Sequence, residues 1–217
     1  MDASAKTVLV IGASKGIGLA VAQKALDAGH AVRAFSRSIK RTDLAHPSLT
    51  KWPGDALDPD DVAKALKGVD VVVQALGLPV GRELIFGPVT LFSRATRVLI
   101  PAMAAAGVDR LIAVTGFGAG DSEHRIACLQ RLPFRATLGR AYADKSVQEA
   151  LITESELNWT IVRPGVLTSR RETGVYRVLA EPEDWRNGVI SRANVAHFIV
   201  GEIEANAYVR KKPVLVA

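Results

Sequence analysis

The 217-residue sequence has a single cysteine, Cys128, so it cannot form an internal disulfide, which fits a reducing compartment. Its apolar runs, such as residues 69–73, are far too short to span a bilayer. The first residues lack the basic start and the long apolar stretch of a secretory signal. We therefore expect a cytoplasmic protein that does not insert into membranes.

Low-complexity tracts, long runs of one charge and repeats of fixed period are also missing, so nothing in the sequence indicates disorder. Hydrophobic residues make up 48% of the chain, which is ordinary for a protein with a buried core. The length suits one α/β domain, because two independent domains would each be small. We expect residues 1–217 to form a single domain.

The formal charge of +6 raises the question of a nucleic-acid partner. One stretch without acidic residues holds Arg125, Arg131, Arg135 and Arg140. These arginines lie among the chain breakers Pro133 and Gly139, and no nucleic-acid motif accompanies them. The pattern favours a solvated face or a lining for anionic ligands, and it makes nucleic acid an unexpected partner.

Short apolar runs alternate with helical patterns along the whole chain, which is typical of βαβ units with a parallel sheet. Strands are predicted at residues 7–11, 31–35, near Trp52, and at 69–75, 110–115, 159–163 and 212–216. Helices are predicted at residues 16–28, 58–66, 88–106, 140–154 and 193–204. Asp58 is expected to cap the second helix with Pro59 at its first position, and Pro101 to kink the third.

This order predicts an α/β fold of the doubly wound, Rossmann type. The predicted connections include a loop at residues 77–87 and an irregular segment at 116–139 with room for one short helix. In such sheets, ligands bind beyond the carboxyl ends of the strands. We expect residues 116–140 and 166–192 to build a small lobe that covers the substrate.

The most informative stretch is residues 8–18, VLVIGASKGIG, in which a buried strand, a glycine turn and a helix follow one another. Gly12 permits the tight turn, Gly16 lets the backbone approach a pyrophosphate, and Gly18 lets the helix pack close to the sheet. The pyrophosphate then lies at the helix N-terminus, near Ser14, Lys15 and Ile17. The strand before and the helix after the glycines satisfy the context of a dinucleotide site.

The end of the second predicted strand indicates which dinucleotide binds. An NAD site usually has Asp or Glu there to hold the ribose 2′-OH. This sequence has Ser36-Arg37-Ser38, and the first carboxylate is Asp43. A 2′-phosphate needs a planar, permanently charged partner, so Arg37 predicts NADP, with Ser36, Ser38, Lys15 and Lys40 as further donors. The alternative is that Arg37 is only a surface arginine after a strand.

Segments outside the glycine loop also form a recognisable set: residues 54–57 (GDAL), 71–77 (VVVQALG), 111–115 (LIAVT), Lys145 with Glu149, and 159–165 (WTIVRPG). Together with residues 12–18 (GASKGIG), they resemble the atypical short-chain dehydrogenases/reductases. The branch in question includes biliverdin reductase B, a flavin reductase, and the NmrA-like proteins. The resemblance covers nearly the whole chain and implies the Rossmann fold and an NAD(P)H cofactor.

The resemblance also implies roles for individual residues. Asp55 and Ala56 are expected near the adenine, and the segment Ala75, Leu76 and Gly77 along the ribose. Thr115 is expected at the serine position near the nicotinamide, and Arg163, Pro164 and Gly165 are expected to close over the nicotinamide side. Two structural alternatives stay open: Asp55 capping the turn before a helix, and Arg163 pairing with a carboxylate under the sheet.

The sequence departs from the family at the catalytic motif Tyr-x-x-x-Lys, where the lysine lowers the pKa of the tyrosine. Tyr142 and Lys145 are one residue too close, which makes them less favourable helical neighbours. Tyr208 and Lys212 have the right spacing but lie far along the chain from the cofactor elements. Thr115, Tyr142 and Lys145 remain the catalytic candidates, without the ordinary alcohol-dehydrogenase mechanism.

No metal site is predicted, because the four histidines, His30, His46, His124 and His197, lack metal-ligand spacing. Cys128 has no CxxC partner, which favours a small buried residue over a nucleophile.

The leading hypothesis is an NADPH-dependent oxidoreductase that transfers hydride to a small conjugated acceptor of the flavin, quinone or carbonyl type. The alternative is an NmrA-like regulatory protein that senses NADP without catalysis, and the missing Tyr-x-x-x-Lys favours it. A nucleotide-sugar epimerase is less favoured, because we see no long C-terminal substrate domain. The oligomeric state and the identity of the substrate do not follow from the sequence.

Overall fold

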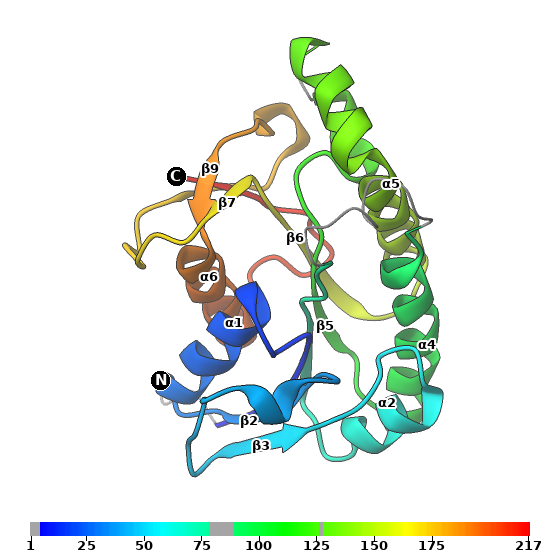
Figure 1. Cartoon of the computed structure of the whole chain (residues 1–217), viewed down its shortest axis with the longest axis vertical. Coiled ribbons are helices and arrows are strands. Elements are labelled where there is room, and N and C mark those ends of the chain that lie inside the picture. The colour runs from blue at the N-terminus through cyan, green and yellow to red at the C-terminus, as the bar shows by residue number, and fades with distance from the viewer. Residues whose placement is uncertain (1–4, 79–88, 126–127) are drawn as a thin grey trace.

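The computed structural model describes residues 5–78, 89–125 and 128–217, with side chains for all of these except residues 128–137. A central sheet has helices on both of its faces, with α1 and α6 on one face and α2, α4 and α5 on the other (Figure 1). The helices are α1 (Gly16–Asp27), α2 (Pro59–Leu66), α4 (Leu91–Ala106), α5 (Cys128–Thr153) and α6 (Arg192–Ala205). Short 3₁₀ helices are η1 (Ile39–Arg41), η2 (Gly120–Arg125) and η3 (Pro182–Asp184).

Within the described residues, the main sheet has eight strands in the order β3-β2-β1-β4-β5-β6-β10-β8. All neighbours run parallel except β8, which is antiparallel to β10. The strands are β1 (Thr7–Ile11), β2 (Ala31–Phe35), β3 (Leu49–Trp52), β4 (Val71–Gln74), β5 (Arg110–Val114), β6 (Asn158–Pro164), β8 (Arg177–Leu179) and β10 (Val214–Val216). A separate parallel pair joins β7 (Val166–Thr168) and β9 (Val189–Ser191). This order confirms the doubly wound fold. From β1 the chain adds β2 and β3 on one side and then returns to add β4, β5 and β6 on the other. Such folds bind ligands at this switch point between β1 and β4.

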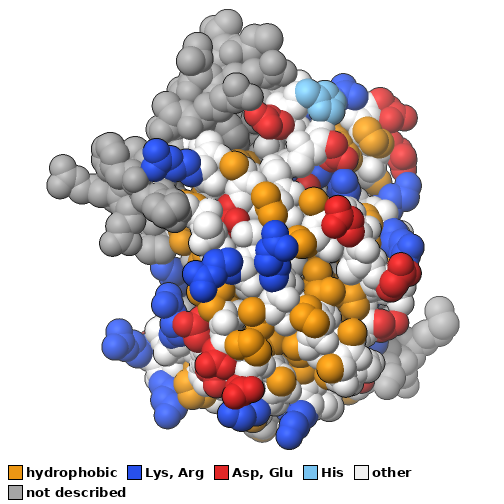
Figure 2. All heavy atoms as spheres, turned by 90° about the vertical axis from the view of Figure 1, so that its right-hand side faces the viewer, with side chains coloured by type: hydrophobic (Ala, Val, Ile, Leu, Met, Phe, Trp, Pro, Cys, Tyr) orange, Lys and Arg blue, Asp and Glu red, His pale blue; other side chains and the backbone are white. Residues whose placement is uncertain are grey.

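Both faces of the sheet are buried, as is usual for parallel strands. Along β1, Val8 and Val10 pack with the α1 and α6 side chains, while Leu9 and Ile11 pack with those of α2 and α4. This alternation follows from the two-residue period of a strand. The outer face formed by α2, α4 and α5 carries clustered hydrophobic side chains among charged ones (Figure 2).

The structure corrects the predicted irregular segment at residues 116–139. After η2, helix α5 begins at Cys128 and continues to Thr153 through Pro133 and Gly139, the two predicted chain breakers. Helix α4 contains Pro101 in its interior, as predicted for the helix at residues 88–106. The 166–192 segment contains β7, β8 and β9, none of which was predicted.

Some sequence predictions fall where the structure gives less detail. Most of the predicted loop at 77–87 lies outside the described residues, and so do the side chains of Cys128, Arg131 and Arg135. Arg125 and Arg140 are exposed. No helix among the described residues is long and apolar enough to cross a membrane.

The start of α2 forms as the sequence predicts. The Asp58 carboxylate accepts hydrogen bonds from the backbone N–H groups of Asp60 and Asp61, at 2.8 and 3.1 Å, and Pro59 occupies the first helical position. This cap satisfies two donors that the helix itself cannot pair. The cap therefore fixes where the chain enters α2 after the segment at residues 54–57.

Replacing Asp58 by alanine should lower the free energy of unfolding by about 1 kcal/mol, because the two N–H groups lose their acceptor. Urea denaturation followed by circular dichroism would measure the change. Asp58→Asn retains a side-chain acceptor and should recover most of the stability. An asparagine variant as unstable as the alanine variant would show that the cap is not the cause.

Candidate functional site

A cavity of about 750 Å³ opens at the carboxyl ends of β1, β2, β4 and β5. Its volume is in the usual range for ligand sites. Most of the predicted site residues line it: Gly12, Ser14, Lys15, Gly16, Ile17, Arg37, Asp55, Ala56, Ala75, Leu76, Gly77, Thr115, Tyr142, Lys145 and Pro164. Gly18, Arg163 and Gly165 are not part of the lining.

The three glycines of the loop after β1 are required for different reasons. Gly12 has a φ of +92°, and a Cβ there would lie 2.6 Å from the carbonyl oxygen of Ala75. A Cβ at Gly18 would lie 2.3 Å from the carbonyl oxygen of Gly12, so only glycine allows α1 to pack this close to the loop. Gly16 has a φ of +62° and open space where a side chain would be. That space faces the cavity, which matches the predicted approach of a phosphate.

The N-terminus of α1 is suited to an anion. Lys15 is the N-cap residue, its side chain forms no capping hydrogen bond, and the first turn contains no acidic residue. The backbone N–H groups of this turn therefore face the cavity with the positive end of the helix dipole. Such a terminus binds phosphate groups in many proteins.

The turn after β2 supplies polar groups at the same end of the cavity. Ser36, Arg37 and Ser38 all line it. The Ser36 hydroxyl oxygen is buried and has no hydrogen-bond partner among the described residues. A buried hydroxyl without a partner is costly, so this position suits a ligand oxygen that would complete the bond. Arg37 is exposed and has no carboxylate neighbour in this turn.

Asp55 fits both readings that the sequence left open. One of its carboxylate oxygens accepts the backbone N–H of Leu57 at 3.0 Å, so it does stabilise the turn before α2. The residue also lines the cavity together with Ala56.

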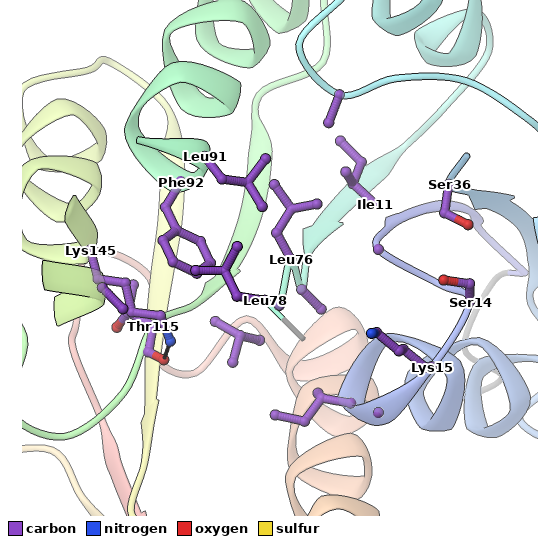
Figure 3. Close-up of a pocket in the computed structure, with 18 of the residues that line it drawn as sticks. Ile11, Ser14, Lys15, Ser36, Leu76, Leu78, Leu91, Phe92, Thr115 and Lys145 are labelled. Atoms are coloured by element: carbon purple, nitrogen blue, oxygen red, sulfur yellow. Dashed lines mark hydrogen bonds between the residues drawn. The ribbon is translucent and has the colours of Figure 1, made fainter. Parts of the chain in front are cut away.

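The opposite end of the cavity holds the catalytic candidates. Ser14, Lys15 and Ser36 lie at one end, and Thr115, Lys145 and Phe92 at the other, with Leu76 and Leu78 between them (Figure 3). The Lys145 Nζ donates to the backbone carbonyl of Thr115. It also lies 5.1 Å from the ring centre of Phe92 and 5.3 Å from that of Tyr142, within the range of cation–π contacts.

Burial changes the acidity of two of these groups. It lowers the pKa of Lys145 to about 8, although the charge of Glu149 acts in the opposite direction. Burial raises the pKa of the Tyr142 hydroxyl above its usual value. The pair thus differs from the usual tyrosine and lysine of the family, in which the lysine lowers the pKa of the tyrosine.

The short spacing predicts that Tyr142 and Lys145 are less favourable helical neighbours than the usual pair. Residues three apart on a helix are neighbours, and both side chains line the same cavity. The ammonium, however, contacts the face of the tyrosine ring. The Tyr142 hydroxyl lies against Gly116, where an added Cβ would come within 2.6 Å of it.

Arg163 lies behind the cavity, where the resemblance had not placed it. Its side chain is fully buried and pairs through Nε and Nη2 with both carboxylate oxygens of Glu149, and through Nη2 with Asp121. Lys212 pairs with the other oxygen of Asp121 at 2.9 Å. This arrangement is the structural alternative, in which the arginine pairs with carboxylates instead of covering the nicotinamide.

Gly165 also lies outside the cavity lining and has a packing role. A Cβ there would come within 2.3 Å of the carbonyl oxygen of Gly188, so glycine permits the close approach of the chain before β9. Pro164 does line the cavity.

The sequence analysis missed several lining residues, notably Leu91, Phe92, Leu138, Leu167 and Arg192. Phe92 and Arg192 lie at the starts of α4 and α6. In this fold, helix N-termini that follow strands lie at the ligand edge of the sheet, and that rule could have identified both. Among the described residues, no group of three or more His, Cys, Asp or Glu side chains is arranged to hold a metal ion.

Comparison with known proteins gives consistent matches. A sequence model of a family described as NAD(P)H-binding matches residues 12–206. An uncharacterized chloroplastic protein of Arabidopsis thaliana is 31% identical over 202 residues, which cover 90% of this chain and 71% of that protein. An uncharacterized sugar epimerase of Bacillus subtilis, YhfK, is 27% identical over 91% of this chain and 87% of its own. Among solved structures, ChuY, an anaerobilin reductase from Escherichia coli O157:H7, is 27% identical with a TM-score of 0.79, covering 97% of this chain and 96% of ChuY.

The open space at Gly16 allows a direct test of the phosphate loop. Gly16→Val would place a branched side chain in the cavity, so affinity for both NADPH and NADH should fall at least ~100-fold, or about 2.7 kcal/mol. Isothermal titration calorimetry would measure both affinities.

The matched control for this variant is Gly68→Val. Gly68 has a similar φ of +68° and open space, but it follows α2 and does not line the cavity. It should show the same backbone strain while binding normally. A folded Gly16→Val protein that keeps its affinity would place the dinucleotide elsewhere.

Proposed function

The chain belongs to the NAD(P)H-binding family, and from this we propose that it is an NADPH-dependent reductase that delivers hydride to a small conjugated acceptor. The observation that supports this most is one cavity with two chemically different ends. A glycine loop and an uncapped helix N-terminus form one end, and Lys145 with two aromatic rings forms the other. When bound, the cofactor would supply the hydride, and the protein would hold, orient and desolvate both reactants.

The acceptor end of the cavity is mainly apolar. Phe92 lies at this end, and Leu78, Leu91, Leu138, Pro164 and Leu167 are further apolar residues of the cavity lining. The apolar lining excludes water, and the ring of Phe92 offers a flat surface for a planar, conjugated molecule. The similarity to ChuY, whose own activity is anaerobilin reduction, supports the same class of reaction.

The preference for NADPH over NADH rests on the turn after β2. Arg37 and Ser38 border the cavity beside the buried Ser36 hydroxyl. This turn has no carboxylate of the kind that holds the ribose 2′-OH in NAD sites. A guanidinium can bind a 2′-phosphate through two hydrogen bonds, which an exposed lysine does less well.

The first functional prediction concerns the choice of cofactor. NADPH should bind at least ~10-fold tighter than NADH, a difference of about 1.4 kcal/mol. Arg37→Ala should remove most of this preference and leave the NADH affinity nearly unchanged, as measured by calorimetry. Arg41→Ala is the matched control, because Arg41 is exposed in the same region but does not line the cavity. Equal affinities in the parent protein would reject the assignment.

The second prediction concerns catalysis itself. With NADPH, the protein should reduce at least one of three acceptors: riboflavin, menadione and the unsaturated ketone 4-phenyl-3-buten-2-one. NADPH oxidation with identification of the product would measure this, with the Gly16→Val protein as the inactive reference. Tyr142→Phe should cost less than the ~100-fold typical of a lost general acid, because its hydroxyl is not coupled to Lys145.

The other outcomes of this experiment identify the rival functions. Tight NADPH binding without reduction of any acceptor would favour the NmrA-like sensor. Conversion of a nucleotide sugar without net NADPH consumption would favour an epimerase, as the name of the Bacillus subtilis relative suggests for that protein.

A further inference from the structure

Reduction of a conjugated carbonyl requires a proton as well as a hydride. When hydride forms a C–H bond at the electrophilic carbon, an electron pair moves onto the oxygen, and that oxygen must be protonated. Among the described residues, Thr115, Tyr142 and Lys145 lie at the reactive end of the cavity, and each carries a proton bound to oxygen or nitrogen. The structure distinguishes between them, and the inference that follows rests on the proposed reductase function.

The Thr115 proton is already committed. Its hydroxyl lies 2.6 Å from a carboxylate oxygen of Glu149. Glu149 forms a buried ion pair with Arg163, and a carboxylate in such a pair only accepts hydrogen bonds. Thr115 must therefore donate to Glu149, which leaves only its lone pairs for the cavity. It can accept a hydrogen bond from a ligand, but it cannot supply a proton.

Tyr142 is poorly placed for proton transfer. Its hydroxyl lies against the backbone at Gly116, and its ring face contacts the Lys145 ammonium. The ammonium therefore does not assist ionisation of the hydroxyl, as the lysine of the usual family motif does. Burial further weakens this acid by raising the pKa of the hydroxyl.

Lys145 has protons available. Its ammonium carries three N–H donors, and within the described part of the chain its one hydrogen bond goes to the Thr115 carbonyl. The rings of Phe92 and Tyr142 hold the ammonium in place without accepting a proton. The side chain lines the cavity, so its remaining N–H groups are available to a ligand there.

We propose that Lys145 is the general acid of the reaction. Bound NADPH would supply the hydride for the new C–H bond. The carbonyl electron pair then moves to oxygen, an Nζ–H bond of Lys145 breaks, and the O–H bond of the product forms. The neutral amine of Lys145 takes a proton from water, which restores the ammonium.

The surroundings of Lys145 are consistent with this role. The charged and titratable groups nearest to it on α5 are Tyr142, Asp144 and Glu149, and those on other elements around the cavity are Lys15, Arg37, Asp55 and Arg192. Asp144 bonds to the start of α4, and Glu149, whose charge acts to raise the pKa of Lys145, is paired with Arg163. Burial therefore dominates and lowers the pKa of Lys145 to about 8, close to the pH at which an acid works best.

The test compares the parent with Lys145→Arg, which keeps the positive charge but does not release a proton near neutral pH. Turnover at saturating NADPH is measured from pH 6 to 10, with 4-phenyl-3-buten-2-one and with riboflavin as acceptors (the pH limits are about two units on either side of the expected pKa). In the parent, ketone reduction should fall as the pH rises through about 8, because the ammonium loses its proton. In Lys145→Arg this fall should disappear, and ketone turnover should drop ~100-fold, well beyond the loss with riboflavin, whose reduction needs no positioned acid.

Two further measurements separate proton donation from a structural role. NMR of ¹³C-methylated lysines should show one lysine titrating near pH 8 that is missing in Lys145→Arg. NADPH affinity, measured by calorimetry, should change less than ~10-fold. Lys64→Arg, an exposed residue on α2, is the matched control and should leave all of these values unchanged.

The proposal is overturned if Lys145→Arg keeps the pH dependence, if its main defect is NADPH binding, or if the parent reduces riboflavin but not the ketone. A parent protein that reduces neither acceptor while binding NADPH instead overturns the proposed function on which this inference rests.

Discussion

The buried ion pair between Arg163 and Glu149 is the interaction on which the reactive end of the cavity depends. It joins β6 to α5 behind the sheet edge, and both side chains are almost completely excluded from solvent. Removing Arg163 would leave the buried Glu149 carboxylate without its ion-pair partner, a loss on the order of 3–5 kcal/mol. Because Glu149 lies one helical turn after Lys145, the same pair sets the position of Lys145. It also fixes the direction of the Thr115 hydroxyl.

The ion pair continues outward, because Arg163 also pairs with Asp121 and Asp121 pairs with Lys212. Charges of alternating sign therefore extend from the cavity wall toward β10, the strand next to β6. Burial by itself raises the pKa of Asp121, but the hydrogen bonds and charges of Lys212 and Arg163 outweigh it and the pKa lies below its ordinary value. Arg163 also stacks over the Trp185 ring at 4.7 Å. The segment at 177–191 is thereby tied to the same guanidinium that orients α5.

Much of the fold could be predicted because local rules and tertiary packing agree there. The residues from Val8 to Gly18 specify a strand, a glycine turn and a helix by local rules alone. Asp58 and Pro59 likewise define a helix start that needs no distant partner. The prediction was wrong where local penalties were overestimated: Pro133 and Gly139 weaken a helix by a few kcal/mol, yet α5 has enough other hydrogen bonds to continue through them. The position of Arg163 could not be assigned, because choosing between a ligand and Glu149 as its partner requires three-dimensional distances.

The hydrogen bonds of Asp144 join α5 to the start of α4. This residue precedes Lys145 on α5, and its carboxylate accepts the backbone N–H groups of Phe92 and Ser93 at the start of α4, at 2.8 and 3.3 Å. The Phe92 ring and the Lys145 ammonium, which are in contact at one wall of the cavity, are thus carried by two helices joined at the same level. Because these hydrogen bonds resist separation of α4 from α5, we expect a bulkier ligand to gain room from the other side of the cavity, where Leu167 and Arg192 contribute to the lining.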